Sequence, residues 1–383
     1  MAREFLVPKK IVNGEGALAE AASAIAGCGT KALIVTDAVM KKLGNLQLLT
    51  EALDTFGVQY SVYSEVNAEP TDQMVYEGVR RFAIDGCNFL IALGGGSPMD
   101  TMKAIALMNG YEGRISDFMG NKFTRPTCPM VAIPTTAGTG SEATQFTIIT
   151  DTSAQVKMLI SSESLIPDIA VIDPIFTKSA PHGVTASTGL DALCHAIESY
   201  TSRKAQPLSK VFSLSAAKLI FDNLEKCCEV PDDMDARSAM SLAALQAGIG
   251  FNNASVTIIH GMSRPIGALF HVPHGLSNAL LMEACLRFAS AGVPDRFAAI
   301  SRYCGLSDDP NDETAAESLI KRIHELLAEL HIPAMSELGI GKNAYYGVLD
   351  KMADDALASG SPQNTWRQPS KQDIIALYKE VYR

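Results

Sequence analysis

The chain of 383 residues is predicted to form an α/β N-terminal domain followed by an all-α C-terminal domain. Up to about Ala180, short apolar runs alternate with segments of helical periodicity, as in βαβ units. Beyond that point the strand patterns stop and segments with helical periodicity take over. The chain is also long for a single hydrophobic core. We place the boundary near Ser179–Gly183, which gives domains of residues 1–180 and 181–383.

The elements of the first domain follow from its β-rich runs and the helical patterns between them. Strands are predicted at Lys31–Thr36, Gln59–Tyr63, Asn88–Leu93 and Pro129–Ile133, and helices at Ala38–Phe56, Thr71–Asp85 and from the GGGSPMD turn through Met108. Strands that alternate with helices in this way imply a largely parallel sheet. Phe146–Thr150 and Val156–Ser161 predict a hairpin added to that sheet.

The second domain is predicted from segments with a period of 3.6 residues. Helices are expected at Thr188–Thr201, Pro207–Asn223, Ala236–Gly248, Thr314–Leu330 and Lys371–Val381.

Composition narrows the functional class. The net charge of −10, without a Lys/Arg run, argues against a nucleic-acid partner. No apolar run approaches the roughly 20 residues of a membrane span, and Met1–Lys10 lacks the apolar core of a signal peptide. The eight cysteines include no CxxC pair and form no dense disulfide framework. We therefore expect a cytoplasmic protein without a cysteine zinc site, and a homo-oligomer that is a dimer or larger.

Two loops rich in glycine predict a nucleotide site. Gly94–Asp100 (GGGSPMD) lies at a strand-to-helix turn, where glycines let the backbone approach a pyrophosphate. It lacks the third glycine of a GxGxxG fingerprint, and a tight turn without a ligand is the alternative. Pro134–Glu142 (PTTAGTGSE) is a second such loop. Asp37 ends the first predicted strand and can accept hydrogen bonds from an adenosine ribose, which favours NAD over NADP; a helix N-cap is its other role.

Four of the seven histidines, His195, His260, His271 and His274, group with a carboxylate in the sequence, and three of them are candidate ligands. Asp191 and His195 are four residues apart and share one helix face. His260 is predicted to lie at the end of an apolar helix (SVTIIHG), and His274 lies in a PHG turn. A simple Asp–His pair is the alternative, but one aspartate with three histidines is a plausible set of ligands for Fe²⁺, Zn²⁺ or Mn²⁺. Because no cysteine is among these ligands, we expect a catalytic rather than a structural metal.

At this point the chain resembles the iron-containing (group III) alcohol dehydrogenase family over nearly its whole length. The resemblance is carried by GGGSPMD, PTTAGTGSE, TGLDALCHAIESY (188–200), FNNA (251–254) and HGMSRPIGALFHVPHG (260–275). It implies a Rossmann-like first domain, an active site in the cleft between the domains, and an iron ion held by Asp191, His195, His260 and His274. It further implies NAD contacts from Asp37, Gly95, Gly96, Ser97, Asp100, Thr135, Thr136, Thr139 and Lys157, with Phe251 packed near the nicotinamide ring.

The predicted activity is hydride transfer between NAD(H) and a short-chain primary alcohol or aldehyde, whose oxygen the metal polarises. His271 is the candidate for a proton route, and a partly exposed loop histidine is its alternative. Arg264 departs from the family, because many members carry a second histidine there. It forms either a salt bridge or cofactor contact, or it binds the acidic tail of a substrate such as succinic semialdehyde or sulfoacetaldehyde.

Two other classes compete with a dehydrogenase. A lyase of the dehydroquinate-synthase type also uses NAD and a metal, but it predicts many Lys/Arg residues near the motifs, and this chain has few. A nucleotide-binding protein without catalytic activity would not need four metal ligands.

Overall fold

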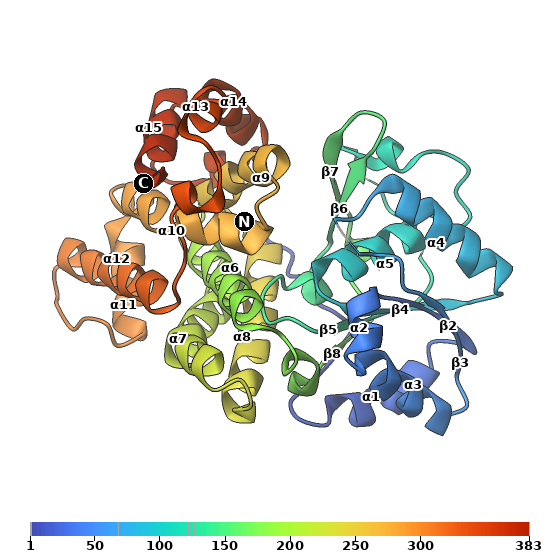
Figure 1. Ribbon diagram of the computed structural model, residues 1–383. Coiled ribbons are helices and arrows are strands. Elements are labelled where there is room, and N and C mark those ends of the chain that lie inside the picture. The colour runs from blue at the N-terminus through green and yellow to red at the C-terminus, as the bar shows by residue number, and fades with distance from the viewer. Residues whose placement is uncertain (1, 68, 122, 126, 383) are drawn as a thin grey trace. The chain divides into compact units, whose positions relative to one another are not determined.

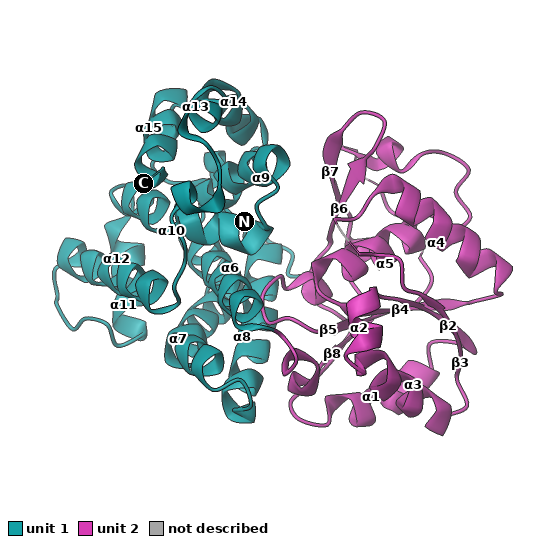
Figure 2. Ribbon diagram, in the orientation of Figure 1, with its two compact units in different colours: residues 1–5, 181–383 teal, residues 6–180 magenta. Residues whose placement is uncertain are grey.

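The computed structural model describes residues 2–67, 69–121, 123–125 and 127–382 (Figure 1). The chain divides into two compact units, Leu6–Ala180 and residues 1–5 together with 181–383 (Figure 2). The first unit is an α/β domain and the second is helical in its described residues, as the sequence predicts.

The α/β unit is built on a parallel sheet of six strands in the order β1-β8-β5-β4-β2-β3. The strands are β1 (Lys10–Asn13), β2 (Lys31–Val35), β3 (Gln59–Tyr63), β4 (Phe89–Gly94), β5 (Met130–Pro134) and β8 (Ile169–Ile172). The main helices between them are α1 (Ala17–Ala26), α3 (Asn45–Thr55), α4 (Asp72–Ile84) and α5 (Gly96–Met108). Parallel strands place their carboxyl ends, and the loops that follow, at one edge of the sheet.

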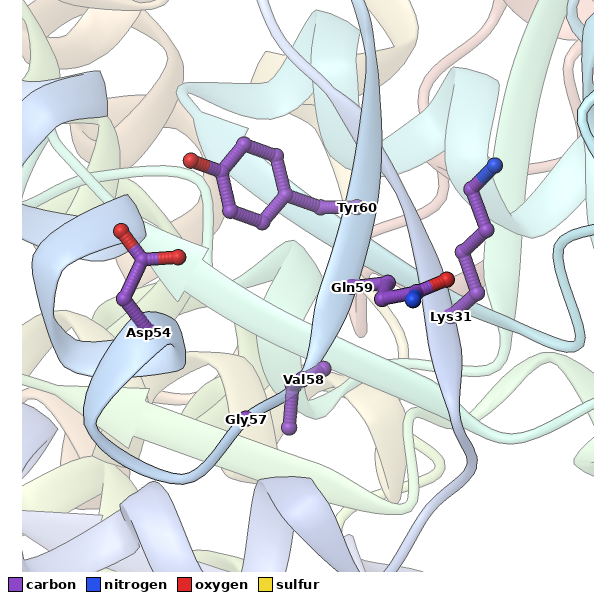
Figure 3. A pocket seen from close by; sticks show the side chains of 6 residues that line it. All are labelled: Lys31, Asp54, Gly57, Val58, Gln59 and Tyr60. Carbon is purple, nitrogen blue, oxygen red and sulfur yellow. The ribbon is translucent and has the colours of Figure 1, made fainter.

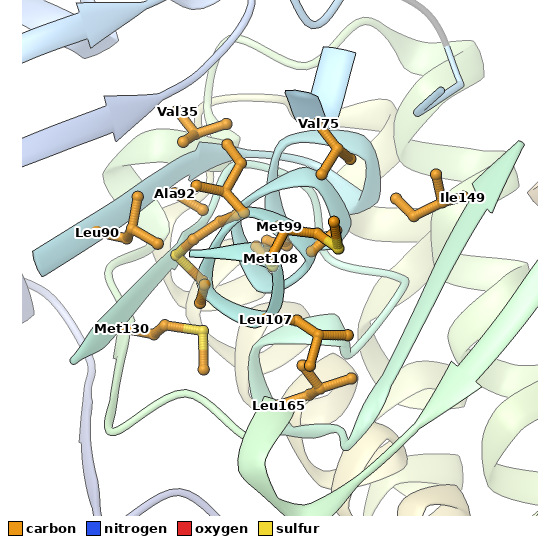
Figure 4. Close-up of a cluster of buried hydrophobic side chains, with 14 of the residues drawn as sticks. Val35, Val75, Leu90, Ala92, Met99, Leu107, Met108, Met130, Ile149 and Leu165 are labelled. Carbon is orange, nitrogen blue, oxygen red and sulfur yellow. The ribbon is translucent and has the colours of Figure 1, made fainter. Parts of the chain in front are cut away.

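Both faces of the sheet are covered, because successive side chains of a strand point to opposite sides. On β2, Leu33 and Val35 pack with α4 and α5, whereas Ala32 and Ile34 pack with α1 and α3. Figure 4 shows the first of these cores, in which Val35 and other strand residues face Met99 of α5. Strands buried on both faces explain the nearly continuous apolar runs in the sequence.

Three details differ from the sequence-based prediction. The single helix expected over Ala38–Phe56 is two helices, α2 (Ala38–Lys42) and α3, because Gly44 between them has φ +83°. The predicted hairpin exists as β6 (Phe146–Asp151) and β7 (Val156–Ser161), but it forms a separate antiparallel sheet of two strands. The edge strand β1, the strand β8 and helix α1 were not predicted; each of the two strands has only four residues.

A hollow of about 440 Å³ lies at the amino ends of β2 and β3. It is lined by Lys31, Asp54, Gly57, Val58, Gln59 and Tyr60 (Figure 3). Open α/β sheets bind ligands at the carboxyl ends of their strands. This hollow therefore lies away from the predicted nucleotide loops, and we assign it no part in the site.

The helical unit contains α6 (His182–Thr201), α7 (Pro207–Glu229), α8 (Met234–Asn252), α9 (Ile258–Phe270), α10 (His274–Ser290), α11 (Pro294–Tyr303), α12 (Asp312–Glu329), α13 (Lys342–Tyr346), α14 (Leu349–Ala358) and α15 (Lys371–Val381). Helix α6 packs against α7, α8 and α10, so its residues are mostly buried. Helix α9 starts at Ile258 and continues through Pro265, so the prediction of a helix that ends at His260 is wrong and His260 lies in the first turn instead. The helix therefore places Arg264 one turn after His260.

Short 3₁₀ helices complete the described structure, at Ile115–Phe118, Ser141–Ala143, Glu163–Leu165, Pro174–Thr177, Met335–Leu338 and Pro362–Asn364. All eight cysteines are free thiols. None of the helices in the described residues combines the length and the apolar character that crossing a membrane would require.

Candidate active site

Three helices of the helical unit bring the predicted metal ligands together. Asp191 and His195 lie on the same buried face of α6. His260 is the third residue of α9, and His274 is the first residue of α10. Gly275 allows α10 to start close to α6, because a Cβ at Gly275 would lie only 2.5 Å from the carbonyl oxygen of Ser187.

The ligand atoms converge on one carboxylate oxygen. Asp191 Oδ1 lies 3.5 Å from Nε2 of His260 and 3.8 Å from Nε2 of both His195 and His274. One potential ligand atom from each of Asp191, His195 and His260 falls within a common span of 4.8 Å. The His195 and His260 rings stack with centroids 4.5 Å apart. His274 closes the group from the more open side, because 46% of its side chain is exposed.

The electrostatics suit a cation in this position. Burial by itself would raise the pKa of Asp191, which is 2% exposed, but the surrounding imidazoles outweigh it and hold that pKa far below its usual range. Burial lowers the pKa of His195 to about 3, so this imidazole is neutral at pH 7. Burial would also lower the pKa of His260, but Glu198 and Asp191 outweigh it and raise that pKa to about 9, so a metal ion binds His260 by displacing a proton. A charged carboxylate beside neutral imidazoles is then the form in which these groups bind a divalent ion.

Asn278 adds a further polar group to the cluster. Its Nδ2 donates to Asp191 Oδ1 at 2.6 Å and lies 3.2 Å from Nε2 of both His260 and His274. The atoms that converge here are thus one carboxylate oxygen and three imidazole nitrogens. Histidine and carboxylate ligands without a thiolate suit a divalent ion. The residues present therefore fit a metal ion.

Sequence reasoning missed Glu198, Thr257 and Asn278. Glu198 is fully buried on α6, and its carboxylate contacts His260 and the start of α9. Its spacing of three residues from His195 and seven from Asp191 was a signal, since those positions share a helix face. Asn278 carried the same signal, four residues after His274.

The three residues predicted to act beside the metal lie in different settings. Phe251 stacks on His195, with ring centroids 4.3 Å apart. Arg264 is half-buried, and its guanidinium makes no hydrogen bond or ion pair with any described residue. His271 is exposed at the C-cap of α9, in a left-handed conformation with φ +56°. Its ring likewise makes no polar contact within the described parts of the chain.

The two glycine-rich loops of the α/β unit lie side by side. The Thr135 amide donates to Gly94 O at 3.0 Å, where β5 ends beside β4. A Cβ on Gly95 would lie 3.5 Å from Thr136 Oγ1, and one on Gly96 would lie 3.2 Å from Thr139 Cγ2. Helix α5 begins at Gly96, so its first amides are directed toward the same loops.

Of the remaining predicted cofactor residues, Asp37, Asp100 and Lys157 have partners within the protein. Asp37 caps α2 by accepting from the amides of Val39 at 2.8 Å and Met40 at 3.0 Å, and it follows β2. Ser97 lies half-buried in the first turn of α5.

Asp100 and Lys157 are anchored as well. Asp100 accepts from Ser141 Oγ at 2.8 Å and from the Ile148 amide at 3.0 Å. Lys157 Nζ pairs with Glu69 Oε1 at 2.7 Å. Both side chains thus tie α5, β6 and β7 to their surroundings.

Known proteins place this chain in a family. Residues 8–174 match the sequence profile "Iron-containing alcohol dehydrogenase", and residues 185–382 match "Fe-containing alcohol dehydrogenase family, C-terminal". These two matches, one in each unit of the chain, identify the protein as an oxidoreductase of the alcohol dehydrogenase class. The chain belongs to the iron-containing alcohol dehydrogenase family. The sequence-based resemblance is confirmed, and the lyase and non-catalytic alternatives are set aside.

The relatives cover the whole chain. The NAD-dependent methanol dehydrogenase of Bacillus methanolicus is 34% identical over 381 residues, which are 98% of this chain and 99% of the relative. A crystal structure of 1,3-propanediol oxidoreductase superposes with a TM-score of 0.96 at 32% identity, covering 100% of both chains. The sulfoacetaldehyde reductase of Bifidobacterium kashiwanohense in complex with NAD⁺ has a TM-score of 0.90 at 26% identity and covers 100% of this chain and 99% of its own.

Proposed function

We propose that this protein is a metal-dependent, NAD(H)-linked dehydrogenase of a short-chain primary alcohol, or reductase of the corresponding aldehyde. The observation that carries the proposal is the convergence of three imidazole nitrogens on Oδ1 of the buried Asp191. A set of histidine and carboxylate ligands without a thiolate is typical of a catalytic metal. Relatives that are named as dehydrogenases of methanol and 1,3-propanediol support the substrate class.

The metal would be held by Asp191, His195, His260 and His274. We propose Fe²⁺ on the strength of the family, with Zn²⁺ and Mn²⁺ as alternatives that the same ligands accept. When bound, a divalent ion supplies a Lewis acid that polarises the oxygen of the aldehyde or alcohol. The protein's own contribution is a buried carboxylate that is already ionised and an imidazole, His195, that is already neutral.

We propose that the two glycine-rich loops bind the cofactor. Backbone amides at the start of α5 suit the pyrophosphate, and the Thr136 and Thr139 hydroxyls lie beside the glycines of that turn. Asp37 would accept hydrogen bonds from the adenosine ribose and repel a 2′-phosphate. Contacts are proposed for Asp37, Gly95, Gly96, Ser97, Asp100, Thr135, Thr136, Thr139 and Lys157. A relative that binds NAD⁺ supports this choice of dinucleotide.

Two further residues are proposed to serve the reaction. Phe251 stacks on the ligand His195 and would present its other face to the nicotinamide ring. His271 would exchange a proton with water, for which its exposure is favourable.

Arg264 favours a second candidate function, the reduction of a short anionic aldehyde such as sulfoacetaldehyde or succinic semialdehyde. Its guanidinium is half-buried and lacks a polar partner among the described residues. Burial lowers the pKa of Arg264, and the nearby charge of Glu198 only partly offsets this. A bidentate carboxylate or sulfonate would compensate that burial. The sulfoacetaldehyde reductase among the structural relatives supports this class.

We also propose a cytoplasmic homo-oligomer, a dimer or larger. Eight free thiols suit a reducing compartment. Leu208 and Val211 are 54% and 64% exposed on one turn of α7, which favours burial against another copy. Sedimentation equilibrium would measure the assembly directly, and a monomer at all concentrations would contradict it.

The activity is tested by following NADH absorbance with a panel of aldehydes before and after treatment with a chelator. The panel should pair neutral substrates, such as lactaldehyde and butanal, with sulfoacetaldehyde and succinic semialdehyde. We expect turnover that disappears on chelation and returns with an added divalent ion. Turnover that survives complete removal of the metal would contradict the proposal. Preference for neutral aldehydes would refute the second candidate alone.

A further inference from the structure

A fully buried carboxylate lies directly behind one of the proposed metal ligands. Glu198 of α6 has an exposed fraction of 0% and sits three residues after His195. Burying a charged group is costly unless it is fully hydrogen-bonded. The contacts that Glu198 makes therefore indicate what it is for.

Both carboxylate oxygens of Glu198 are engaged by the start of α9. Oε1 accepts from Thr257 Oγ1 and from the Ile259 amide, each at 2.7 Å. Oε2 lies 2.5 Å from His260 Nδ1. Thr257 is the N-cap residue of α9, and the Ile259 amide is one of the first-turn donors that have no acceptor within the helix. A negative charge at a helix N-terminus is also favourable. Glu198 thus anchors this turn from another helix.

The contact with Nδ1 determines which nitrogen of His260 is free. An ionised carboxylate only accepts hydrogen bonds, so the proton of a neutral His260 must lie on Nδ1. Its Nε2 then carries the lone pair, and this is the atom that lies 3.5 Å from Asp191 Oδ1. A histidine that binds a metal through one nitrogen commonly donates from the other to a carboxylate, which fixes the tautomer and the ring orientation.

We propose that Glu198 is a positioning residue for the metal site: it fixes His260 with the proton on Nδ1 and Nε2 directed at the other ligands. This inference rests on the proposed metal site but adds a residue that does not itself touch the metal. A role confined to packing or to capping α9 would be indifferent to the tautomer of His260. The two roles therefore predict different consequences for a change that keeps shape and removes charge.

The test variant is Glu198→Gln. An amide nitrogen facing His260 Nδ1 can only donate, which moves the imidazole proton to Nε2 and blocks the metal-binding lone pair. If the amide is turned the other way, the buried Ile259 amide loses its acceptor. The matched control is Thr257→Val, which removes one hydrogen bond from Oε1 and leaves the contact between Oε2 and His260.

The measurement is the dissociation constant of Zn²⁺, and of Fe²⁺ under anaerobic conditions, by competition with a chromogenic chelator on metal-free protein. Changes to such supporting groups weaken metal binding by roughly 10–100-fold, which is the loss expected for Glu198→Gln. Thr257→Val should stay within about threefold of wild type by the same reasoning. Equal losses in both variants, or unchanged affinity in Glu198→Gln, would overturn the positioning role.

A measurement on the wild type covers the case in which Glu198→Gln does not fold. Nitrogen-15 NMR of the zinc-loaded protein reports which ring nitrogen carries the proton, and the His260→Gln spectrum assigns the signal. We expect the proton on Nδ1 of His260; a proton on Nε2 would refute the inference. Wild type that binds neither ion would instead reject the metal site itself, and with it the proposed function.

Discussion

Glu142, in the second glycine-rich loop, makes the stability of the α/β unit depend on pH. The side chain is 2% exposed, and burial raises the pKa of Glu142 from 4.5 to about 7, with Lys103 opposing the shift. Lys103 is itself buried and donates to Ser141 Oγ and Thr144 Oγ1, both at 3.0 Å, and its pKa is lowered to about 8 by burial. Asp100, which also faces Lys103, opposes that lowering.

The sign and size of this pH dependence of stability follow from the shifted pKa of Glu142. Below pH 4.5 the carboxyl is protonated in both states, and between pH 4.5 and about 7 only the unfolded chain releases the proton. The unfolded state is therefore favoured as pH rises, and stability is lost up to pH 7 but not beyond. A shift from 4.5 to about 7 corresponds to about 3 kcal/mol, with about 1.4 kcal/mol for each pKa unit.

The test variant is Glu142→Gln, which keeps the shape of the side chain and replaces the ionisable carboxyl with a neutral amide. We expect its free energy of unfolding, relative to wild type, to increase by about 2 to 3 kcal/mol between pH 5 and pH 7.5. Urea unfolding followed by circular dichroism at several pH values measures this. Glu163→Gln, the same change at an exposed position, serves as the control and should follow wild type. Parallel curves for wild type and Glu142→Gln would refute the reasoning.

Three further predictions concern the site. Asp37→Asn keeps the N-cap of α2 but removes the charge, so kcat/KM for NADPH should rise relative to kcat/KM for NADH. Equal use of both cofactors by wild type would contradict the role of Asp37. Gly275→Ala should lower the free energy of unfolding by about 1–3 kcal/mol and weaken metal binding, because the new Cβ would lie 2.5 Å from Ser187 O. Gly183→Ala is the control, since no atom lies within 4 Å of its Cβ position. Equal effects of the two changes on metal affinity would argue against the role of Gly275. Arg264→Ala should raise KM for sulfoacetaldehyde at least about tenfold, because a charged hydrogen-bonded pair is lost, and should leave KM for neutral aldehydes unchanged. Equal increases in KM for both classes of aldehyde would contradict the anion-binding role.

The sequence predicted those parts of the molecule whose signals are local. Asp191 and His195 could be paired because a spacing of four residues places both on one helix face. The strands β2 to β5 could be predicted because burial on both faces gives long apolar runs. The short strands β1 and β8 carry too little pattern, and the break at Gly44 was hidden within an otherwise helical segment.

Contacts between distant segments could not be predicted from periodicity. The groups that donate to Glu198 lie about sixty positions away, since Thr257 and Ile259 are separated from it by 59 and 61 residues. Asn278 reaches Asp191 across 87 residues. Only the packing of α6 against α9 and α10 brings these polar side chains to the predicted ligands.

The central claim is that Asp191, with three histidines, binds a catalytic divalent ion. Metal analysis by mass spectrometry, made side by side on purified wild type and Asp191→Ala, tests it most directly. We expect about one divalent ion per chain in wild type and almost none in the variant, because loss of the carboxylate removes both a ligand and the only negative charge among the four ligands. An Asp191→Ala protein that retains the full metal content and full NADH-linked turnover would contradict it.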